Sequence, residues 1–232
     1  MPDKWTLDSP PACDTSLIMS IGFKEWAIVC KAISGGDQSI IIRKGGIHEG
    51  RNGFRFQHDE FFLFPTLFHE QVARTTLPPD TPVPASPGSE VRINTFVRVE
   101  SAELISDLST ALQLRPFHIL RDSVVEDRFN YDEPRGVNIA VIRAYRLPEP
   151  WKFPMEKKYG GCRSWVALPD PPDFPEMEAV ISDEAHRLRM EQMRHLAAGV
   201  FVSSEYTTPV AGAREKGEIT SNCGVRSGPA EP

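Results

Sequence analysis

Residues 39–71, SIIIRKGGIHEGRNGFRFQHDEFFLFPTLFHEQ, carry most of the chain's unusual chemistry and decide which fold the sequence predicts. The run Ile40–Lys44 is short and begins with β-branched residues, which is typical of a strand, and Asn52-Gly53 is the dipeptide favoured in tight primed turns. Residues 54–58 then alternate apolar and polar side chains with period two. The stretch therefore predicts a β-hairpin, followed by the apolar run Phe61–Phe64.

Periodic apolar positions predict the remaining helices and strands. Residues 22–34 favour a helix, although a strand is the competing interpretation because the middle of this segment is rich in strand formers. Two strands are expected at 91–99 and 137–145, and a last one after the glycines at 160–161. Further helices are expected at 104–112, from Asp122 onward, and after an N-cap at Ser182 as far as about 196.

Composition divides the chain into four parts. Residues 1–18 contain three prolines and few periodic apolar positions, which predicts a flexible N-terminal arm. Residues 19–170 form the expected core domain, with a proline-rich loop at 72–89, and 171–200 supply a linker and a C-terminal helix. Residues 201–232 are rich in Ser, Thr, Gly, Pro and Glu with almost no aromatic residues, which predicts a disordered tail.

The length of 232 residues and the hydrophobic share of 40% suit one large soluble domain or two small ones. No apolar run approaches the roughly 18 residues of a membrane span, and the N-terminus lacks the basic and apolar regions of a signal peptide. We therefore expect a cytoplasmic protein that makes no membrane contact. The four cysteines lie far apart without CxxC spacing, so free thiols are expected.

The net charge of −6 argues against a protein that binds nucleic acid over its whole surface, because phosphates attract Lys and Arg. The distribution of charge is uneven, however. Residues 19–166 contain 19 Lys and Arg against 18 Asp and Glu, so the excess of acid lies in the two ends. A local basic patch in the central part is compatible with this sequence.

A cationic pair leaves the first predicted strand at a glycine turn. Arg43 and Lys44 precede Gly45 and Gly46, so two cations and backbone N–H groups can converge there on one anion or base edge. Arg51 follows in a GxxG sequence of the kind that KH domains place between helices, whereas here it falls between predicted strands. The simpler alternative is a strand end that reaches water.

Acid–base chemistry is a second possibility for the same stretch. Its candidates are Lys44, Glu49, Glu60, Thr66 and His69, because a lysine desolvated in an apolar pocket can be tuned toward neutrality and activate a hydroxyl or a water. The alternative is a hydrophobic hairpin with solvated charges between its core positions.

Other chemistries have weaker signals. The His and acid pairs at 48–49, 58–60 and 69–70 match no zinc signature, so no metal site is predicted and the cofactor is left open. Cys162 precedes Arg163, which favours a lowered thiol pKa, but a buried inert cysteine is the commoner case. The Glu-x-Lys at 156–158 lacks an upstream Asp on a strand, and GxSxG, Walker A and Rossmann glycine patterns are absent from the sequence.

Six motifs in order resemble the bacterial family known as domain of unknown function 1802, over roughly residues 20 to 170. They are FKEWAIVCKAI (23–33), IIIRKGGIHEG (40–50), FFLFPTLFH (61–69), RFNYD (128–132), RAYRLPEP (143–150) and YGGCRSW (159–165). Occasional fusion of that family to restriction-endonuclease-like domains implies a link to nucleic-acid processing or defence.

The order of elements is also similar to PUA-like modules, including the ASCH group. That resemblance implies a small curved β-barrel with helices at its openings, which binds RNA or modified bases; some ASCH relatives hydrolyse small amides with a Lys, a Thr and a Glu. The insertion around residues 45–89 is longer than such barrels usually carry.

Together these observations predict an α+β protein with one curved, mostly antiparallel sheet or a small PUA-like barrel, flanking helices and a disordered C-terminal tail. The leading hypothesis for function is a nucleic-acid or nucleotide-recognition module, whose partner is RNA, DNA or a nucleotide. Arg43, Lys44, Gly45, Gly46 and Arg51 would bind the ligand with the aromatic residues of 54–64. The alternatives are a small hydrolase of amides or nucleosides, with or without a metal, and a protein-interaction subunit.

Overall fold

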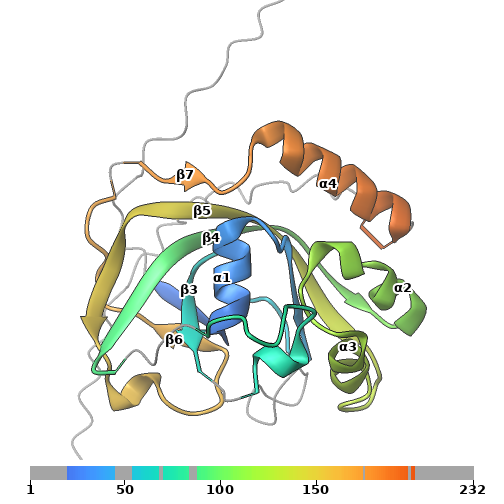
Figure 1. Cartoon of the computed structure of the whole chain (residues 1–232), viewed down its shortest axis with the longest axis horizontal. Coiled ribbons are helices and arrows are strands. Elements are labelled where there is room, and N and C mark those ends of the chain that lie inside the picture. Colours follow the sequence, from blue (N-terminus) through green and yellow to red (C-terminus); the bar gives the residue numbers. More distant parts are fainter. Residues whose placement is uncertain are drawn as a thin grey trace, which may run out of the picture. The chain divides into compact units, whose positions relative to one another are not determined.

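The computed structural model describes residues 20–44, 54–67, 70–83, 88–174, 176–197 and 200–201, and all structural statements below concern these residues. Seven strands and four α-helices make up a mixed α+β fold with one curved sheet (Figure 1). The strands are β1 Ile21–Trp26, β2 Ile40–Arg43, β3 Glu60–Thr66, β4 Glu90–Ile105, β5 Val137–Pro154, β6 Trp165–Ala167 and β7 Glu178–Ala179. The helices are α1 Ala27–Gly35, α2 Leu108–Gln113, α3 Asp122–Phe129 and α4 Asp183–Leu196, with short 3-10 turns at Val72–Arg74, Arg115–Phe117 and Lys157–Tyr159.

The sheet has the strand order β2-β5-β4-β3-β1-β6, and β7 pairs with β5 beside β2. Only β1 and β3 run parallel; every other pair is antiparallel. Its centre is the long pair β4 and β5, which runs from Glu90 opposite Pro154 to Ile105 opposite Val137. Register shifts at Ile93/Thr95 and Val99/Ser101 interrupt this pair, and such irregularities bend and twist a strand. The expected curved, mostly antiparallel sheet is therefore confirmed.

The sheet buries apolar side chains on both faces, as the alternation along β3 shows. Phe61 and Leu63 join a larger core with α1, β2 and the helices α2 and α3, whereas Phe62 and Phe64 join a smaller core with the outer ends of β4 and β5. Because successive strand residues point to opposite faces, a run of four apolar residues serves both cores.

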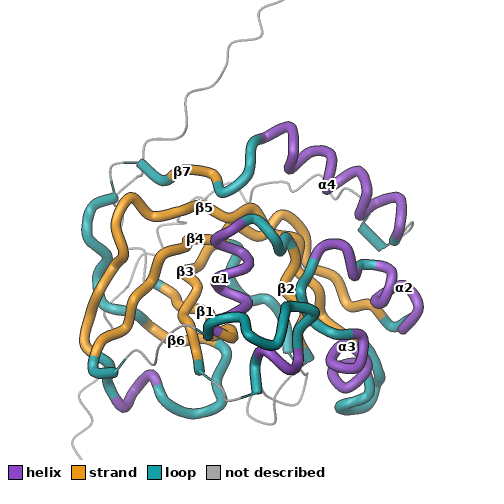
Figure 2. The backbone as a smooth tube through the Cα atoms, in the orientation of Figure 1, coloured by secondary structure: helices purple, strands orange, loops and turns teal. Residues whose placement is uncertain are grey.

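Helices cover the sheet at several places (Figures 1 and 2). α1 follows β1 without a loop, lies against the sheet and ends at Gly36, whose φ of 83° favours glycine. α2 and α3 fill the connection between β4 and β5. α4 lies beyond β7, where Arg143 of β5 donates to Asp183 at 2.5 Å and Ser182 accepts a cap hydrogen bond from the Ala185 N–H. The predicted Ser182 cap is thus confirmed.

The predicted hairpin is wrong in its pairing. β2 pairs with β5 rather than with residues 54–58, which are not a strand. The reason is burial: Ile40, Ile41 and Ile42 are at most 1% exposed, so β2 is buried on both faces, and it pairs with the equally buried start of β5. The segment 54–58 alternates with exposed side chains, and the predicted Asn52-Gly53 turn lies outside the described residues.

Three element boundaries also differ from the sequence-based expectation. The helix expected at 22–34 begins only at Ala27, because 21–26 form β1 between β3 and β6. β4 continues to Ile105, so the helix expected from 104 begins at Leu108. β5 was expected to end at 145 but continues through Pro148 to Pro154. Pro148 falls in the irregular part of the pairing with β4, where no backbone N–H is needed for the ladder.

Candidate functional site

Side chains, rather than backbone hydrogen bonds, link the two edges of the sheet. Arg43 at the end of β2 donates from Nη2 to Ser164 Oγ at 2.6 Å, directly before β6. Its Nη1 lies 3.9 Å from Glu25 Oε2 on β1, and its guanidinium carbon stands 5.2 Å from the ring centre of Phe23 and 5.8 Å from that of Phe54. We call this junction the seam; it consists of Glu25, Arg43, Phe54, Ser164, Trp165 and, from α3, Arg128.

Glu25 is the buried acid of the seam, with only 2% of the residue exposed. Its Oε1 accepts a hydrogen bond from the Trp26 N–H at 2.8 Å, and its backbone carbonyl accepts one from Thr66 Oγ1 at 2.9 Å. Burial, reinforced by the charge of Glu25, raises the pKa of the neighbouring Cys30 thiol well above its usual value. The carboxylate therefore sits inside the protein beside Arg43, where its charge needs compensation.

A second guanidinium approaches Glu25 from α3. Arg128 donates to the carbonyl of Ile42, and its guanidinium carbon stands 5.0 Å from the ring centre of Trp26. Burial lowers the pKa of Arg128 to about 10; Glu25 opposes this shift, and the cations Arg43 and Arg74 add to it. The buried carboxylate of Glu25 thus lies near the guanidinium of Arg43 and also interacts electrostatically with that of Arg128.

Aromatic side chains continue the seam toward the surface. Trp165 packs edge-on against Phe23 at 4.7 Å and against His58 at 4.9 Å between ring centres, and Phe56 lies 6.5 Å from Trp165. We call Phe56, His58 and Trp165 the aromatic ledge, because all three side chains are partly exposed. Within the described residues, Trp165 Nε1 and Arg43 Nε are buried and have no hydrogen-bond partner.

Lys24 holds the loop that supplies Ser164. Its Nζ donates to the carbonyls of Gly160 and Gly161, both at 3.0 Å, and its backbone N–H donates to the carbonyl of Ser164 at 2.8 Å. Burial lowers the pKa of Lys24; the charge of Cys162 opposes this shift and that of Arg163 adds to it. Because Lys24 is anchored at both ends of this loop, it fixes the position from which Ser164 contacts Arg43.

The structure separates the residues that the sequence analysis grouped. Arg43 lies in the seam, whereas Lys44 donates from Nζ to the Pro134 carbonyl at 2.8 Å on the surface. Glu60 forms an exposed ion pair with Arg98 at 2.8 Å, and Thr66 lies at the other end of β3. Six strand steps place the Cα atoms of Glu60 and Thr66 roughly 20 Å apart, so these two residues do not share one reacting centre.

The other predicted site residues, Gly45, Gly46, Glu49, Arg51 and His69, lie outside the described residues. Their roles stay predictions. Among the described residues there is no group of three or more His, Cys, Asp or Glu side chains that could hold a metal ion. In the same part of the chain no helix is long and apolar enough to cross a membrane.

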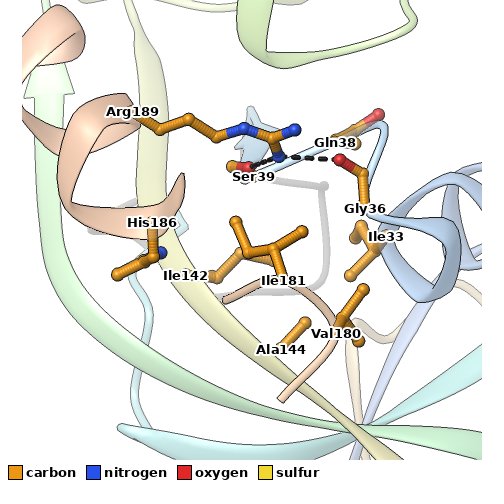
Figure 3. A pocket seen from close by; sticks show the side chains of 10 residues that line it. All are labelled: Ile33, Gly36, Gln38, Ser39, Ile142, Ala144, Val180, Ile181, His186 and Arg189. Carbon is orange, nitrogen blue, oxygen red and sulfur yellow. Dashed lines mark hydrogen bonds between the residues drawn. The ribbon is translucent and has the colours of Figure 1, made fainter. Parts of the chain in front are cut away.

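A small cavity lies under α4, away from the seam (Figure 3). It measures about 10 Å³, which is room for about one water molecule. Arg189 of α4 closes it by donating to the Gly36 carbonyl and to Ser39 Oγ, each at 2.7 Å. His186 Nε2 lies 2.8 Å from Glu100 Oε1 near the same place. These contacts fix α4 to the sheet and leave too little space for a ligand.

Sequence analysis missed most of the seam. Glu25, Arg128, Ser164 and Trp165 were part of recognised motifs, but their spacing along the chain gives no sign that they meet. Arg43 and Ser164 are 121 positions apart. The one local signal was a charged pair, Lys24 and Glu25, inside an otherwise apolar segment that the structure buries.

Comparison with known proteins gives both structural and family matches. The crystal structure of ASCH from Zymomonas mobilis is similar with 11% sequence identity and a TM-score of 0.39, over 75% of this chain and 94% of that chain. A crystal structure of a mutant of the same protein matches with 12% identity and a TM-score of 0.40, over 65% of this chain and 89% of that one. No curated protein matches. The model of the family described as Domain of unknown function (DUF1802) matches residues 22–192, which contain the seam and extend into α4, and the chain therefore belongs to this family.

Proposed function

We propose that the seam recognises a nucleotide or a single-stranded nucleic acid. The observation that carries this proposal is a pair of buried donors without partners among the described residues, Arg43 Nε and Trp165 Nε1, beside partly exposed aromatic rings. Buried donors are almost always satisfied, so two in one junction favour a bound group that accepts hydrogen bonds. The link to restriction or defence stays a prediction from the family resemblance.

The aromatic ledge supplies the surface for a base. Phe61, Phe62 and Phe64 are at most 8% exposed and belong to the cores, so among the described residues the accessible rings of this region are Phe56, His58 and Trp165. Stacking of a base on an aromatic side chain contributes about 1–3 kcal/mol and tolerates any base. Because the rings are only partly exposed, we expect an unstacked base to reach them more readily than a paired base inside a duplex.

Cations surround the ledge although the whole chain is acidic. Arg55 and Arg163 are exposed beside Phe56 and Ser164, and Lys44 follows Arg43. Such local cations attract a phosphate backbone in a salt-dependent way. The ledge for bases and the adjacent cations for phosphates together support recognition of single strands.

Fluorescence anisotropy with labelled single- and double-stranded oligonucleotides at low salt tests this proposal. We expect the single strands to bind more tightly than the duplexes, with an affinity that falls as salt rises. Arg43→Gln is expected to weaken binding by roughly 10-fold or more, because a charge-assisted hydrogen bond contributes about 1.5–3 kcal/mol. Trp165→Phe keeps the ring in the core but removes Nε1, and a smaller loss is expected.

The matched control is Arg92→Gln. Arg92 is exposed and forms one ion pair with Glu90 at 2.9 Å at the start of β4, so its loss removes one positive charge outside the seam. Thermal melting of each variant establishes that it is folded. Absence of binding by the wild type, or equal losses in the Arg43 and Arg92 variants, would contradict a nucleotide site at the seam.

A further inference from the structure

Among the described residues, the seam contains two guanidinium groups, of Arg43 and Arg128, and one carboxylate, that of Glu25. Arg43 and Arg128 both interact with Glu25, and one carboxylate cannot neutralise two guanidinium groups. Arg74 adds a third cation, but its Nη1 lies 3.3 Å from Asp127 Oδ2, which compensates it. An excess charge in a poorly hydrated place is costly unless a counterion is present.

Neighbouring cations add to the effect of burial on the pKa values of two groups in this region, Arg128 and His118. Burial first, and then Arg43 and Arg74, lower the pKa of Arg128 to about 10. Burial, with the charge of Arg128 next, lowers the pKa of His118 to about 4. Both shifts disfavour additional positive charge at this position, and a bound anion would relieve them.

Donors for an anion are present. A guanidinium has five N–H donors in a planar fork that fits phosphate oxygens. Arg43 uses Nη2 for Ser164 and keeps its buried Nε without a partner among the described residues. Arg128 uses Nη1 for the carbonyl of Ile42, the residue next to Arg43. Both guanidiniums are therefore held by neighbouring backbone or side-chain groups, and the Nε–H of Arg43 is available to donate to a ligand.

We propose that Arg43 and Arg128 together bind a phosphate monoester of the ligand, which acts as the counterion that Glu25 alone cannot provide. This inference rests on the proposed function and names the ligand class more narrowly: a nucleoside monophosphate or a strand with a terminal phosphate. Both arginines are only partly exposed, so a phosphate that enters end-on fits better than one with chain on both sides. A monoester also carries nearly two negative charges at pH 7.

Isothermal titration of the wild type with AMP, adenosine and inorganic phosphate tests the subsite. AMP is expected to bind at least 10-fold more tightly than adenosine, and inorganic phosphate to compete with AMP. Arg128→Gln is expected to remove the advantage of AMP and to leave adenosine binding unchanged, because Arg128 does not contact the aromatic ledge. Arg128→Lys keeps the charge and should recover part of the advantage, and Arg92→Gln should behave as the wild type.

The outcomes separate the two proposals. Equal affinities of the wild type for AMP and adenosine overturn the phosphate subsite, and leave base recognition at the ledge intact. Binding of AMP and of inorganic phosphate that depends on Arg128, with no measurable binding of adenosine, supports the subsite and contradicts base recognition at the ledge. An unchanged preference for AMP in a folded Arg128→Gln protein overturns the role of Arg128. If this variant does not fold, the comparison of AMP with adenosine in the wild type still tests the phosphate subsite.

Discussion

Glu25 illustrates how individual residues of the seam depend on one another. A buried carboxylate is stable only where cations and hydrogen-bond donors replace its lost hydration. Glu25 accepts a hydrogen bond from the Trp26 N–H, lies 3.9 Å from Arg43 Nη1 and interacts electrostatically with Arg128. The same arrangement that stabilises the acid also leaves the two cations short of one negative charge. The ligand site that we propose would therefore use the two cations of this ion cluster.

His118 gives a pH-dependent prediction at this scale. Burial lowers its pKa from 6.5 to about 4, so between these values the unfolded chain binds a proton that the folded protein does not. Its contribution to the free energy of unfolding is therefore complete above pH 6.5 and is lost as the pH falls toward 4, at about 1.4 kcal/mol per pH unit. Urea unfolding at pH 7 and pH 5 measures this loss.

A matched pair of variants isolates the His118 effect. His118→Asn keeps an acceptor for the Leu120 N–H, which donates to His118 Nδ1 at 3.1 Å, but does not titrate in this range. We expect a shallower pH dependence in this variant. His195→Gln replaces an exposed histidine of α4 and should leave the dependence unchanged. Identical slopes in wild type and His118→Asn would show that His118 is not the responsible group.

At the scale of elements, the sequence predicts which segments form strands better than which strands pair. Ile40–Ile42 and the start of β5 are recognisable as strands from their own residues. Their pairing depends on burial on both faces, which is a property of the assembled sheet. The dipeptide Asn52-Gly53 favours a tight turn, and for that reason a hairpin was predicted. The long-range pairing of β2 with β5 cannot be read from such a local pattern. The local sequence also indicated Arg43 as a candidate, because it lies at the end of a predicted strand before a glycine turn. It did not indicate the residues that contact Arg43 in the folded protein.

The Ser182 cap gives a prediction for α4. Ser182 Oγ accepts from the Ala185 N–H at 3.2 Å, and loss of such a cap typically costs about 1 kcal/mol. Ser182→Ala is therefore expected to lower the free energy of unfolding by about this amount and to speed hydrogen exchange of the α4 amides. Ser182→Thr retains a side-chain acceptor and should stay close to wild type. Equal exchange rates in both variants would exclude the cap as a determinant of α4 stability.

At the scale of the whole molecule, curvature brings together the two ends of the strand order. β2 and β6 are the first and last strands of a path of six, yet Arg43 at the end of β2 contacts Ser164 directly before β6. The long irregular pair β4 and β5 supplies the bend, and the side chains of the seam occupy the junction that the backbone leaves open. The site is therefore a consequence of how the sheet curves, which no single motif encodes.

The most direct test of a nucleotide site at the seam is the indole N–H resonance of Trp165 in a ¹⁵N NMR titration with AMP. The chain has four tryptophans, and Trp165→Phe identifies the resonance of interest. Trp151, which is 5% exposed in the second core, serves as the internal reference. We predict that the Trp165 signal moves with AMP while that of Trp151 stays in place. A Trp165 signal that remains unchanged as AMP is added would contradict ligand binding at the seam.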